Sequence, residues 1–272
     1  MKKTIVVFGS GAMGGTLIRA WIRHQAFAPN EIYAIDLDHQ KLRQLKKECR
    51  VSTAQTPGLF LEKADMVLMA VKPQQFKNLL DQYHHRISTR TLIVTIVAGI
   101  STSRVETLLQ KRIRVVRVMP NTPALVGYGM TALTKGKYAT RLDLQWIQKL
   151  FSTVGQTIQV PESQMNAITA LSGSGPGYMF YWIEALVEAG IQQGLSKSTA
   201  LLLATQTMLG SAQLLLQTKR DPEELRTQVT SPNGTTAAGL LQFEQSQLKC
   251  MVAQAIAAAT QRGKELEKES KP

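Results

Sequence analysis

The sequence predicts an α/β fold in which a doubly wound parallel sheet is followed by an all-helical domain. Three observations support this prediction. Apolar runs of strand length alternate with helical stretches up to residue 160. A glycine-rich turn lies directly between the first run and the first helical stretch. Beyond residue 162, segments rich in alanine and leucine dominate and strand patterns almost disappear. We therefore expect two domains, at residues 1–161 and 162–272.

The expected strands are continuous β-branched or aliphatic runs, which are typical of strands buried on both faces of a parallel sheet. They cover residues 4–8, 31–36, 66–71, 92–99, 114–119, 130–133 and 157–160. Helical spacing separates them at 16–22, around 42–45, at 74–83, from 101–103 onward and at 142–151. In sheets of this kind, ligands bind beyond the carboxyl ends of the strands.

Composition excludes several classes of protein. With 272 residues, 44% hydrophobic and 19% charged, the chain is long enough for two apolar cores. No apolar run approaches the roughly 20 residues of a membrane span, so we expect a cytoplasmic protein with no membrane partner. Cys49 and Cys250 lie far apart and form no ligand cluster, which predicts free thiols and no metal site.

The net charge of +13 raises the question of a nucleic-acid partner. The basic residues are mostly dispersed, with local groups at 41–50 and 111–117 and no recognisable nucleic-acid motif. Attraction to anionic small molecules explains the charge equally well. We therefore expect a small-molecule substrate and no nucleic acid. A non-catalytic protein that senses dinucleotides or binds nucleic acid is the most distant alternative.

Directly after the first expected strand, six residues form the pattern G-x-G-x-x-G: Gly9, Ser10, Gly11, Ala12, Met13 and Gly14. Between a strand and a helix, this pattern indicates a Rossmann-like dinucleotide site. The glycines allow a tight turn, close approach of a pyrophosphate, and close packing of the helix on the strand.

Asp36 ends the second expected strand, where such sites carry an acid. Its carboxylate can accept hydrogen bonds from the ribose hydroxyls and would repel a 2′-phosphate. The expected cofactor is therefore NAD(P)H, with NADH slightly favoured, although Lys41 and Arg43 lie near enough in sequence to tolerate a phosphate. In the alternative interpretation, Asp36 is the N-cap of the following helix.

Further cofactor contacts are expected where other strands end. The candidate residues for the walls of a nicotinamide pocket are Ala70, Val71, Lys72, Pro73, Ala98, Gly99 and Asn121. The alternative is that these motifs are ordinary turns at strand ends, because Gly and Pro often interrupt structure.

The helical part contains recognisable helix starts at Pro176 and Ser196. Tyr178 and Trp182, on the helix that follows Pro176, are expected in the core or in a subunit interface. The polar stretch 261–272 is expected to fray.

Residues 229–239 form a polar, turn-forming run between two helical segments. Pro232 fixes φ, Asn233 and Gly234 accept positive φ, and Thr235 or Thr236 can cap the helix that follows. Free backbone N–H groups at a helix N-terminus stabilise a carboxylate. The alternative is a capped turn with no ligand.

The residues available for proton transfer narrow the reaction. A dehydrogenase acting on a hydroxyl usually needs a base, but the chain has no lysine between Lys149 and Lys197 and no histidine after His85. A C=N bond accepts hydride with only a hydrogen-bond partner on nitrogen, which a threonine can supply. The sequence therefore favours imine reduction, with a β-hydroxyacid dehydrogenase or a reductase of another cyclic imine as alternatives.

Six motifs along the chain together resemble those of the Δ1-pyrroline-5-carboxylate reductase family. They are Gly9-Ser10-Gly11-Ala12-Met13-Gly14, Ala70-Val71-Lys72-Pro73, Val97-Ala98-Gly99-Ile100, Met119-Pro120-Asn121-Thr122-Pro123, Leu171-Ser172-Gly173-Ser174-Gly175-Pro176 and Thr230-Ser231-Pro232-Asn233-Gly234-Thr235-Thr236. The resemblance runs collinearly from about residue 3 to residue 265. It implies reduction of 1-pyrroline-5-carboxylate to L-proline with NAD(P)H, the last step of proline biosynthesis. It also implies a homodimer interlocked through the helical domain, and larger rings such as a decamer. Active sites in the family combine a cofactor domain with helices from the partner.

The same resemblance assigns roles by matching position. Ser231, Gly234 and Thr235 would bind the substrate carboxylate, and Thr236 would be the catalytic residue that hydrogen-bonds the ring nitrogen. Glu162 would be an acid close to the substrate.

The chain departs from the family pattern at several positions. Asn233 stands where the signature loop usually has a glycine, Lys219-Arg220 replaces a glycine or acid, and Pro57 replaces an asparagine near the adenosine. Asp36 is not typical of members that prefer NADPH.

Overall fold

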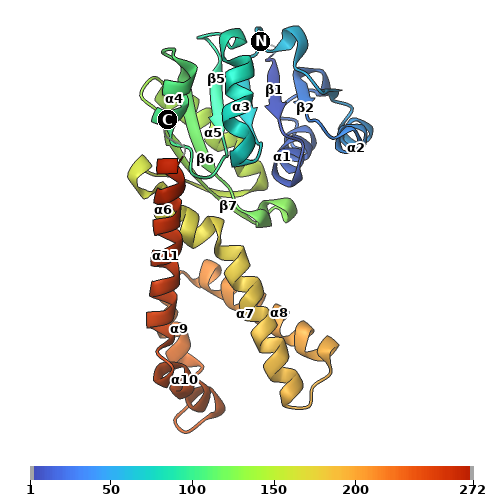
Figure 1. The fold of residues 1–272 in the computed structure, drawn as a ribbon. Helices are drawn as coiled ribbons and strands as arrows, with labels where there is room; N and C mark the ends of the chain where they lie inside the picture. The colour runs from blue at the N-terminus through green and yellow to red at the C-terminus, as the bar shows by residue number, and fades with distance from the viewer. Residues whose placement is uncertain (1–2, 270–272) are drawn as a thin grey trace. The chain divides into compact units, whose positions relative to one another are not determined.

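The computed structural model describes residues 3–269, which fold into two compact units (Figure 1). The first unit comprises the residues up to Ser174 and those from Ala259 onward, and the second unit comprises Gly175–Ala258. The chain thus leaves the first unit once and returns to it within its last helix. The domain limits 1–161 and 162–272 stay a prediction.

The first unit contains one eight-stranded sheet. Its strands are β1 (Ile5–Phe8), β2 (Ile32–Ile35), β3 (Ser52–Ala54), β4 (Met66–Met69), β5 (Leu92–Thr95), β6 (Arg114–Met119), β7 (Gly129–Lys135) and β8 (Gly155–Gln159). They lie in the order β3-β2-β1-β4-β5-β6-β7-β8, and every neighbouring pair is parallel except β6 with β7. The strand order reverses at β1, between β2 and β4, which confirms the predicted doubly wound sheet.

Helices complete both units. Those of the first unit are α1 (Ala12–Arg23), α2 (His39–Cys49), α3 (Pro73–Tyr83), α4 (Thr102–Leu109), α5 (Arg141–Phe151) and α6 (Met165–Ile168). The second unit holds α7 (Gly175–Gln192), α8 (Lys197–Thr218), α9 (Pro222–Gln228) and α10 (Thr235–Gln245), and α11 (Leu248–Glu269) leads from it back into the first unit. No strand lies among the described residues after β8, as the sequence predicts.

Both faces of the sheet are apolar and covered. Ile5 and Val7 of β1 belong to the core layer that contains residues of α1, α2 and α5, whereas Val6 and Phe8 belong to the layer with residues of α3 and α4. The other central strands divide in the same way, because successive side chains point to opposite faces. This burial explains why the strands read as continuous apolar runs.

The sequence missed β3 and the direction of β7. Strand β3 has only three residues, none of them buried, so it carries no apolar pattern. Strand β7 is antiparallel to β6, and the residues of a buried strand do not reveal its direction. The starts of α4 and α8 are confirmed, since Ser101 and Ser196 cap them.

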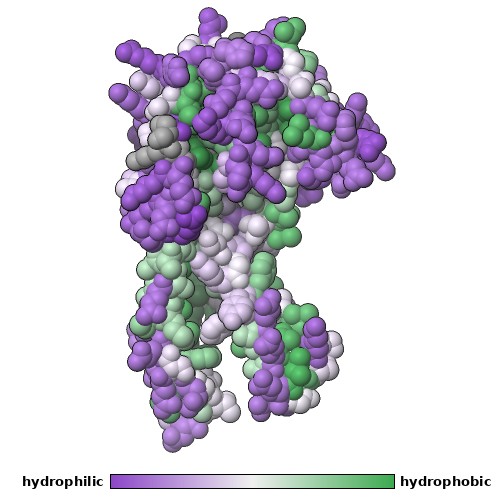
Figure 2. All heavy atoms as spheres, in the orientation of Figure 1, coloured by the Kyte–Doolittle hydropathy of each residue, from purple (hydrophilic) through white to green (hydrophobic). Residues whose placement is uncertain are grey.

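The helical unit leaves many large apolar side chains exposed. Its buried apolar cluster consists of Val187, Ala200 and Ala204. Figure 2 shows hydrophobic residues at the surface of this unit. The exposed ones on α7 and α8 include Met179, Phe180, Tyr181, Leu201, Leu202, Leu203, Leu209, Leu214 and Leu216. Exposed apolar surface of this kind marks an interaction site.

One described helix, α8, is long and apolar enough to cross a membrane by length and composition alone. Only 11% of its apolar window is buried, and the helix carries Gln206 and Gln213 in its middle turns. The expectation that no apolar run approaches the length of a membrane span is therefore too strong for α8.

The C-terminal turns of α11 are fixed to the sheet through a buried arginine. Arg117 of β6, whose side chain is 2% exposed, donates from Nη1 to Glu162 Oε1 (2.6 Å) and to Glu267 Oε1 (2.7 Å). Asn166 donates to the other oxygen of Glu267 (2.9 Å). The prediction that 261–272 frays is thus wrong up to Glu269, and residues 270–272 lie outside the described residues.

We predict that Arg117→Met lowers the free energy of unfolding by about 3 kcal/mol, because two carboxylates lose the buried charge that compensates them. Urea unfolding followed by circular dichroism measures the loss. As a control, Arg86→Met removes an exposed arginine that pairs with Glu62 at 2.7 Å, and it should cost less than about 1 kcal/mol. Equal losses in the two variants would contradict the role of Arg117.

Candidate active site

The glycine turn after β1 has the geometry of a dinucleotide site. Gly9 has φ +98°, and its N–H donates to Ile35 O (2.8 Å). A Cβ on Gly9 would lie 2.4 Å from Ala70 O, and one on Gly14 would lie 2.0 Å from Gly9 O. Both glycines are therefore required for the close packing of α1 on β1 and β4.

Gly11 plays a different part in the same turn. It is the N-cap of α1 and provides no side-chain cap, and a Cβ placed on it would meet no atom within 4 Å. The first N–H groups of α1 thus receive no side-chain cap, which leaves them available to an anion. The adjacent Ser10 is 7% exposed, and its Oγ has no hydrogen-bond partner among the described residues. Both observations fit a pyrophosphate lying against this turn.

Asp36 is fixed at the carboxyl end of β2. Its Oδ2 accepts a hydrogen bond from Ser10 N (2.6 Å) and its Oδ1 accepts one from Asp38 N (3.0 Å). A carboxylate has about four acceptor positions, so capacity for two ribose hydroxyls remains. Asp36 also borders a cavity of about 310 Å³ lined by Leu37 and Gln55.

The N-cap of α2 is Asp38 and not Asp36, so the alternative role for Asp36 is wrong. Asp38 accepts from the backbone N–H groups of Gln40 and Lys41, and Lys41 Nζ lies 3.2 Å from its Oδ2. The hydrogen bonds from Lys41, first from its backbone and then from its side chain, hold the pKa of Asp38 below its usual value. Asp38 thus stays ionised near neutral pH and forms an ion pair with the ammonium group of Lys41.

The other predicted cofactor residues fall into two groups. Ala70 and Val71 lie beside Gly9 at the end of β4, and Lys72 and Pro73, both exposed, begin α3. Strand β4 is the neighbour of β1 where the strand order reverses. These four residues and the turn after β1, with Ala12 and Met13 in the first turn of α1, therefore meet at one edge of the sheet.

The second group lies beyond β5 and β6: Ala98 and Gly99 follow β5, and Asn121 follows β6. Gly99 and Asn121 also have structural roles. Gly99 has φ +72°, and a Cβ on it would lie 2.9 Å from Leu266 Cβ of α11. Asn121 donates to Ser172 O (3.2 Å) and accepts from Met130 N (2.8 Å). These contacts explain both residue types without a cofactor, so their ligand roles stay predictions.

Glu162 is held at both carboxylate oxygens. Oε1 accepts from Arg117, and Oε2 accepts from Thr102 Oγ1 (2.8 Å). Its side chain is 33% exposed. Both oxygens of Glu162 are therefore fixed by hydrogen bonds, and its contact with substrate stays a prediction.

The run 229–239 joins α9 to α10 in the second unit. Gly234, not a threonine, is the N-cap of α10, so the prediction that Thr235 or Thr236 caps this helix is wrong. No side chain caps α10, and both threonines, in its first turn, are exposed. The N-terminus of α10 thus presents free backbone donors beside two hydroxyls.

The sharp turn before α10 depends on its small residues. Gly234 N donates to Ser231 O (3.0 Å), and a Cβ on Gly234 would lie 2.2 Å from Ser231 Oγ. Asn233 has φ +57°, a left-handed conformation that Asn accepts more readily than most residues. Asn233 therefore supplies the conformation that glycine has at the matching family position.

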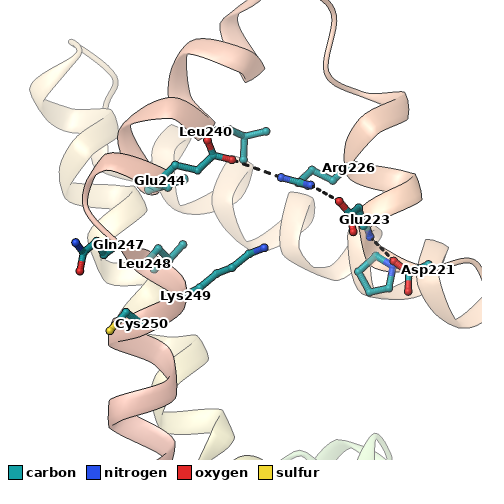
Figure 3. Close-up of a pocket in the computed structure, with 11 residues that line it drawn as sticks. Asp221, Glu223, Arg226, Leu240, Glu244, Gln247, Leu248, Lys249 and Cys250 are labelled. Carbon is teal, nitrogen blue, oxygen red and sulfur yellow. Dashed lines mark hydrogen bonds and ion pairs between the residues drawn. The ribbon is translucent and has the colours of Figure 1, made fainter.

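A cavity of about 820 Å³ lies in the second unit among α9, α10 and the start of α11 (Figure 3). Leu240 and Phe243 give it apolar walls, and Arg226 forms ion pairs there with Glu223 (3.1 Å) and Glu244 (3.8 Å). None of the predicted substrate residues lines this cavity. It is thus not the site that the motifs predict.

Comparison with known proteins decides the family. The model of the pyrroline-5-carboxylate reductase dimerisation domain matches residues 162–266, and a model described as NADP oxidoreductase coenzyme F420-dependent matches residues 4–99. Over 267 residues the chain is 37% identical to the pyrroline-5-carboxylate reductase of Methanosarcina acetivorans, covering 98% of this chain and 99% of that one. The chain belongs to the pyrroline-5-carboxylate reductase family. The predicted family is confirmed.

Solved structures agree with the sequence relatives. A pyrroline-5-carboxylate reductase from Coxiella burnetii superposes with a TM-score of 0.90 at 36% identity, covering 98% of this chain and 99% of that one. The pyrroline carboxylate reductase of Plasmodium falciparum with NADP bound superposes with a TM-score of 0.87 at 26% identity, over 98% and 99% of the two chains. The family fold thus extends over both units.

Sequence reasoning missed Arg117, which holds Glu162. A signal was present, because Arg117 is a charged residue inside an otherwise apolar strand, between Val116 and Val118. A charge in a buried strand needs a compensating partner. Its partners, however, lie 45 and 150 residues away, and no local pattern identifies them.

We predict that Gly11→Ala and Gly14→Ala separate binding from folding. Gly11→Ala should leave the free energy of unfolding within about 0.5 kcal/mol and weaken NADH binding about tenfold or more, because its methyl occupies the space for the pyrophosphate. Gly14→Ala should cost about 1–3 kcal/mol of stability through overpacking. Thermal unfolding and NADH fluorescence titration measure both effects. Unchanged NADH affinity in Gly11→Ala would contradict this placement of the cofactor.

Proposed function

We propose that the chain reduces the C=N bond of 1-pyrroline-5-carboxylate to L-proline with NAD(P)H. The observation that carries this proposal is the start of α10, where the family signature leaves the helix without a side-chain cap. Backbone donors and exposed hydroxyls are then available to a carboxylate. The relatives named above are pyrroline-5-carboxylate reductases. The place of the reaction in proline biosynthesis follows from this activity.

Ser231, Gly234 and Thr235 would bind the substrate carboxylate through backbone and side-chain donors. A helix N-terminus stabilises a negative charge by its dipole and its free N–H groups. The carboxylate would therefore fix the orientation of the ring, and orientation is a large part of catalysis when no acid or base is available.

Thr236 would form a hydrogen bond between its hydroxyl and the ring nitrogen and so be the catalytic residue. Its side chain is exposed, and no histidine or lysine replaces it in the surrounding run. Glu162, fixed by Arg117, would stabilise the positive charge of a protonated imine.

The cofactor would lie against the turn Gly9–Gly14 of the first unit, with Ser10, Gly11, Ala12 and Met13 around its pyrophosphate. When bound, NAD(P)H supplies the hydride. Val71, Lys72 and Pro73 would border its nicotinamide half, together with Ala98, Gly99 and Asn121. The uncapped start of α1 and the unpartnered Ser10 Oγ support this assignment.

NADH is the slightly preferred cofactor in this proposal. Asp36 accepts from Ser10 N of the glycine turn through Oδ2 and from Asp38 N through Oδ1, and a 2′-phosphate on a ribose beside it would meet its charge. Lys41, the nearest cation in sequence, is paired with Asp38. Arg43, which is exposed, is the remaining group that could accept a phosphate.

We propose a cytoplasmic homodimer formed through the helical domain, and a larger ring such as a decamer built from it. The exposed apolar side chains of α7 and α8 support a subunit interface, because they need a cover. The match to a dimerisation model over 162–266 supports the same surface. In such a dimer, α8 is buried by protein and no membrane is required.

We predict that Thr236→Ala lowers kcat/KM for pyrroline-5-carboxylate about 10- to 100-fold, the worth of one hydrogen bond to a charged group. Because the side chain of Thr236 is exposed, Thr236→Ala should leave the thermal stability unchanged. Thr236→Ser, which keeps the hydroxyl, should retain most of the activity. NADH oxidation on addition of the substrate measures the rates, and full activity in Thr236→Ala would remove this residue from the mechanism.

We predict that Asp36→Ser shifts the ratio of kcat/KM for NADH over NADPH about tenfold or more towards NADPH. The lost carboxylate no longer accepts the ribose hydroxyls or repels a 2′-phosphate. Asp81→Ser, the same substitution at an exposed acid that pairs with Lys77, should leave the ratio unchanged. Initial rates with both cofactors side by side measure it, and an unchanged ratio in Asp36→Ser would refute the assignment.

A further inference from the structure

A second polar cavity of the first unit lies outside the glycine turn. Its volume is about 660 Å³, and its walls come from the start of α4, the turn that begins at Glu162, and the last turns of α11. The basic residues that line it are Arg104, Lys264 and Lys268. None of the predicted cofactor residues lines it.

Arg104 is the residue that this cavity leaves unexplained. Only 9% of it is exposed, and its Nε is buried without a hydrogen-bond partner among residues 3–269. Within the same range, no carboxylate forms an ion pair with it. A buried guanidinium without a compensating anion is unfavourable. An anionic ligand in the cavity would compensate it.

The remaining charges around the cavity also favour an anion. Glu162 and Glu267 line it, and both accept from Arg117. Arg117 therefore offsets part of the charge of these two carboxylates, and the lining itself holds more cations than acids. Lys264 and Lys268 are one helical turn apart on α11, and both are exposed. They can therefore reach a ligand from the side opposite α4.

The start of α4 supplies neutral donors at the same place. Ser101 is the N-cap of this eight-residue helix, and its Oγ accepts from Arg104 N (3.2 Å). Ser103 Oγ lies 3.1 Å from Ser101 Oγ. Two hydroxyls that share one hydrogen bond retain at least one free hydrogen. The helix dipole adds a favourable field for an anion.

We propose that this cavity binds a small phosphate-bearing anion, either inorganic phosphate or a phosphate monoester. A phosphate carries a charge of about −1.5 to −2 at neutral pH, which suits the excess of positive charge in the lining. Its oxygens suit the planar guanidinium of Arg104 together with two ammonium groups and a hydroxyl. Glu162 also belongs to the proposed substrate contacts, but phosphate binding is measured without turnover and is therefore tested apart from the reductase activity.

The test is calorimetric titration of the full-length protein with inorganic phosphate and, separately, with glycerol 3-phosphate. NADH is kept saturating so that phosphate cannot bind at the glycine turn, and ionic strength is held constant with chloride. Wild type should bind one phosphate group per chain. Arg104→Gln should weaken binding about tenfold or more, as expected for loss of a charge-assisted bidentate contact.

Two double variants keep the proposal testable if Arg104→Gln does not fold, because they change exposed lysines only. Lys264→Gln with Lys268→Gln should weaken binding several-fold, whereas Lys46→Gln with Lys47→Gln, the same charge change near the end of α2, should have no effect. Binding of both ligands supports a site for any terminal phosphate group, and binding of one identifies the source. No saturable binding by wild type, or equal affinity in the folded Lys264/Lys268 variant, would overturn the proposal.

Discussion

The buried guanidinium of Arg117 is the constraint on which the C-terminal part of the first unit depends. A charge inside an apolar strand must be compensated, and Glu162 and Glu267 do so from turns far apart in sequence. This requirement fixes the last turns of α11 against the sheet, where Leu266 packs on Gly99. The buried Arg117 therefore positions both Glu162, the acid predicted near the substrate, and the last turns of α11.

Because α11 returns to the first unit, the second unit is an insertion in the chain of the first. Because the chain leaves the first unit after Ser174 and re-enters it at Ala259, residues 175–258 are tied to the first unit at both ends. The run 229–239 lies within this excursion. The excursion buries little apolar surface of its own, so its stability depends on contacts beyond its own core. If this run binds substrate as proposed, activity would depend on the assembly that covers the helical unit.

Features with a local cause could be predicted from the sequence, whereas features with a distant cause could not. The apolar strands, the glycine turn and the caps Ser101 and Ser196 each follow from neighbouring residues. The pairing of Arg117 with Glu267 spans 150 residues, and the short exposed strand β3 has no apolar pattern. The polar tail was misread for the same reason, because its helix is held by the distant Arg117. At α10, threonine propensity suggested the cap, but the turn at Gly234 places both threonines inside the helix.

The helices differ in whether a side chain caps their N-terminus, and this difference distinguishes structural turns from candidate ligand sites. Helices α2, α4, α5, α8 and α9 begin at Asp38, Ser101, Thr140, Ser196 and Asp221, whose side chains accept from the first turn. Helices α1, α3, α6 and α10 have Gly11, Lys72, Gln164 and Gly234 as N-caps, without such a side-chain contact. Free N–H groups at a helix start need a partner. At α3, Pro73 removes one of these donors. At α1 and α10, where a glycine leaves the donors open, a pyrophosphate and a carboxylate would complete the helices. In the proposed reaction, the same two glycines would leave helix donors free for the cofactor at α1 and for the substrate at α10.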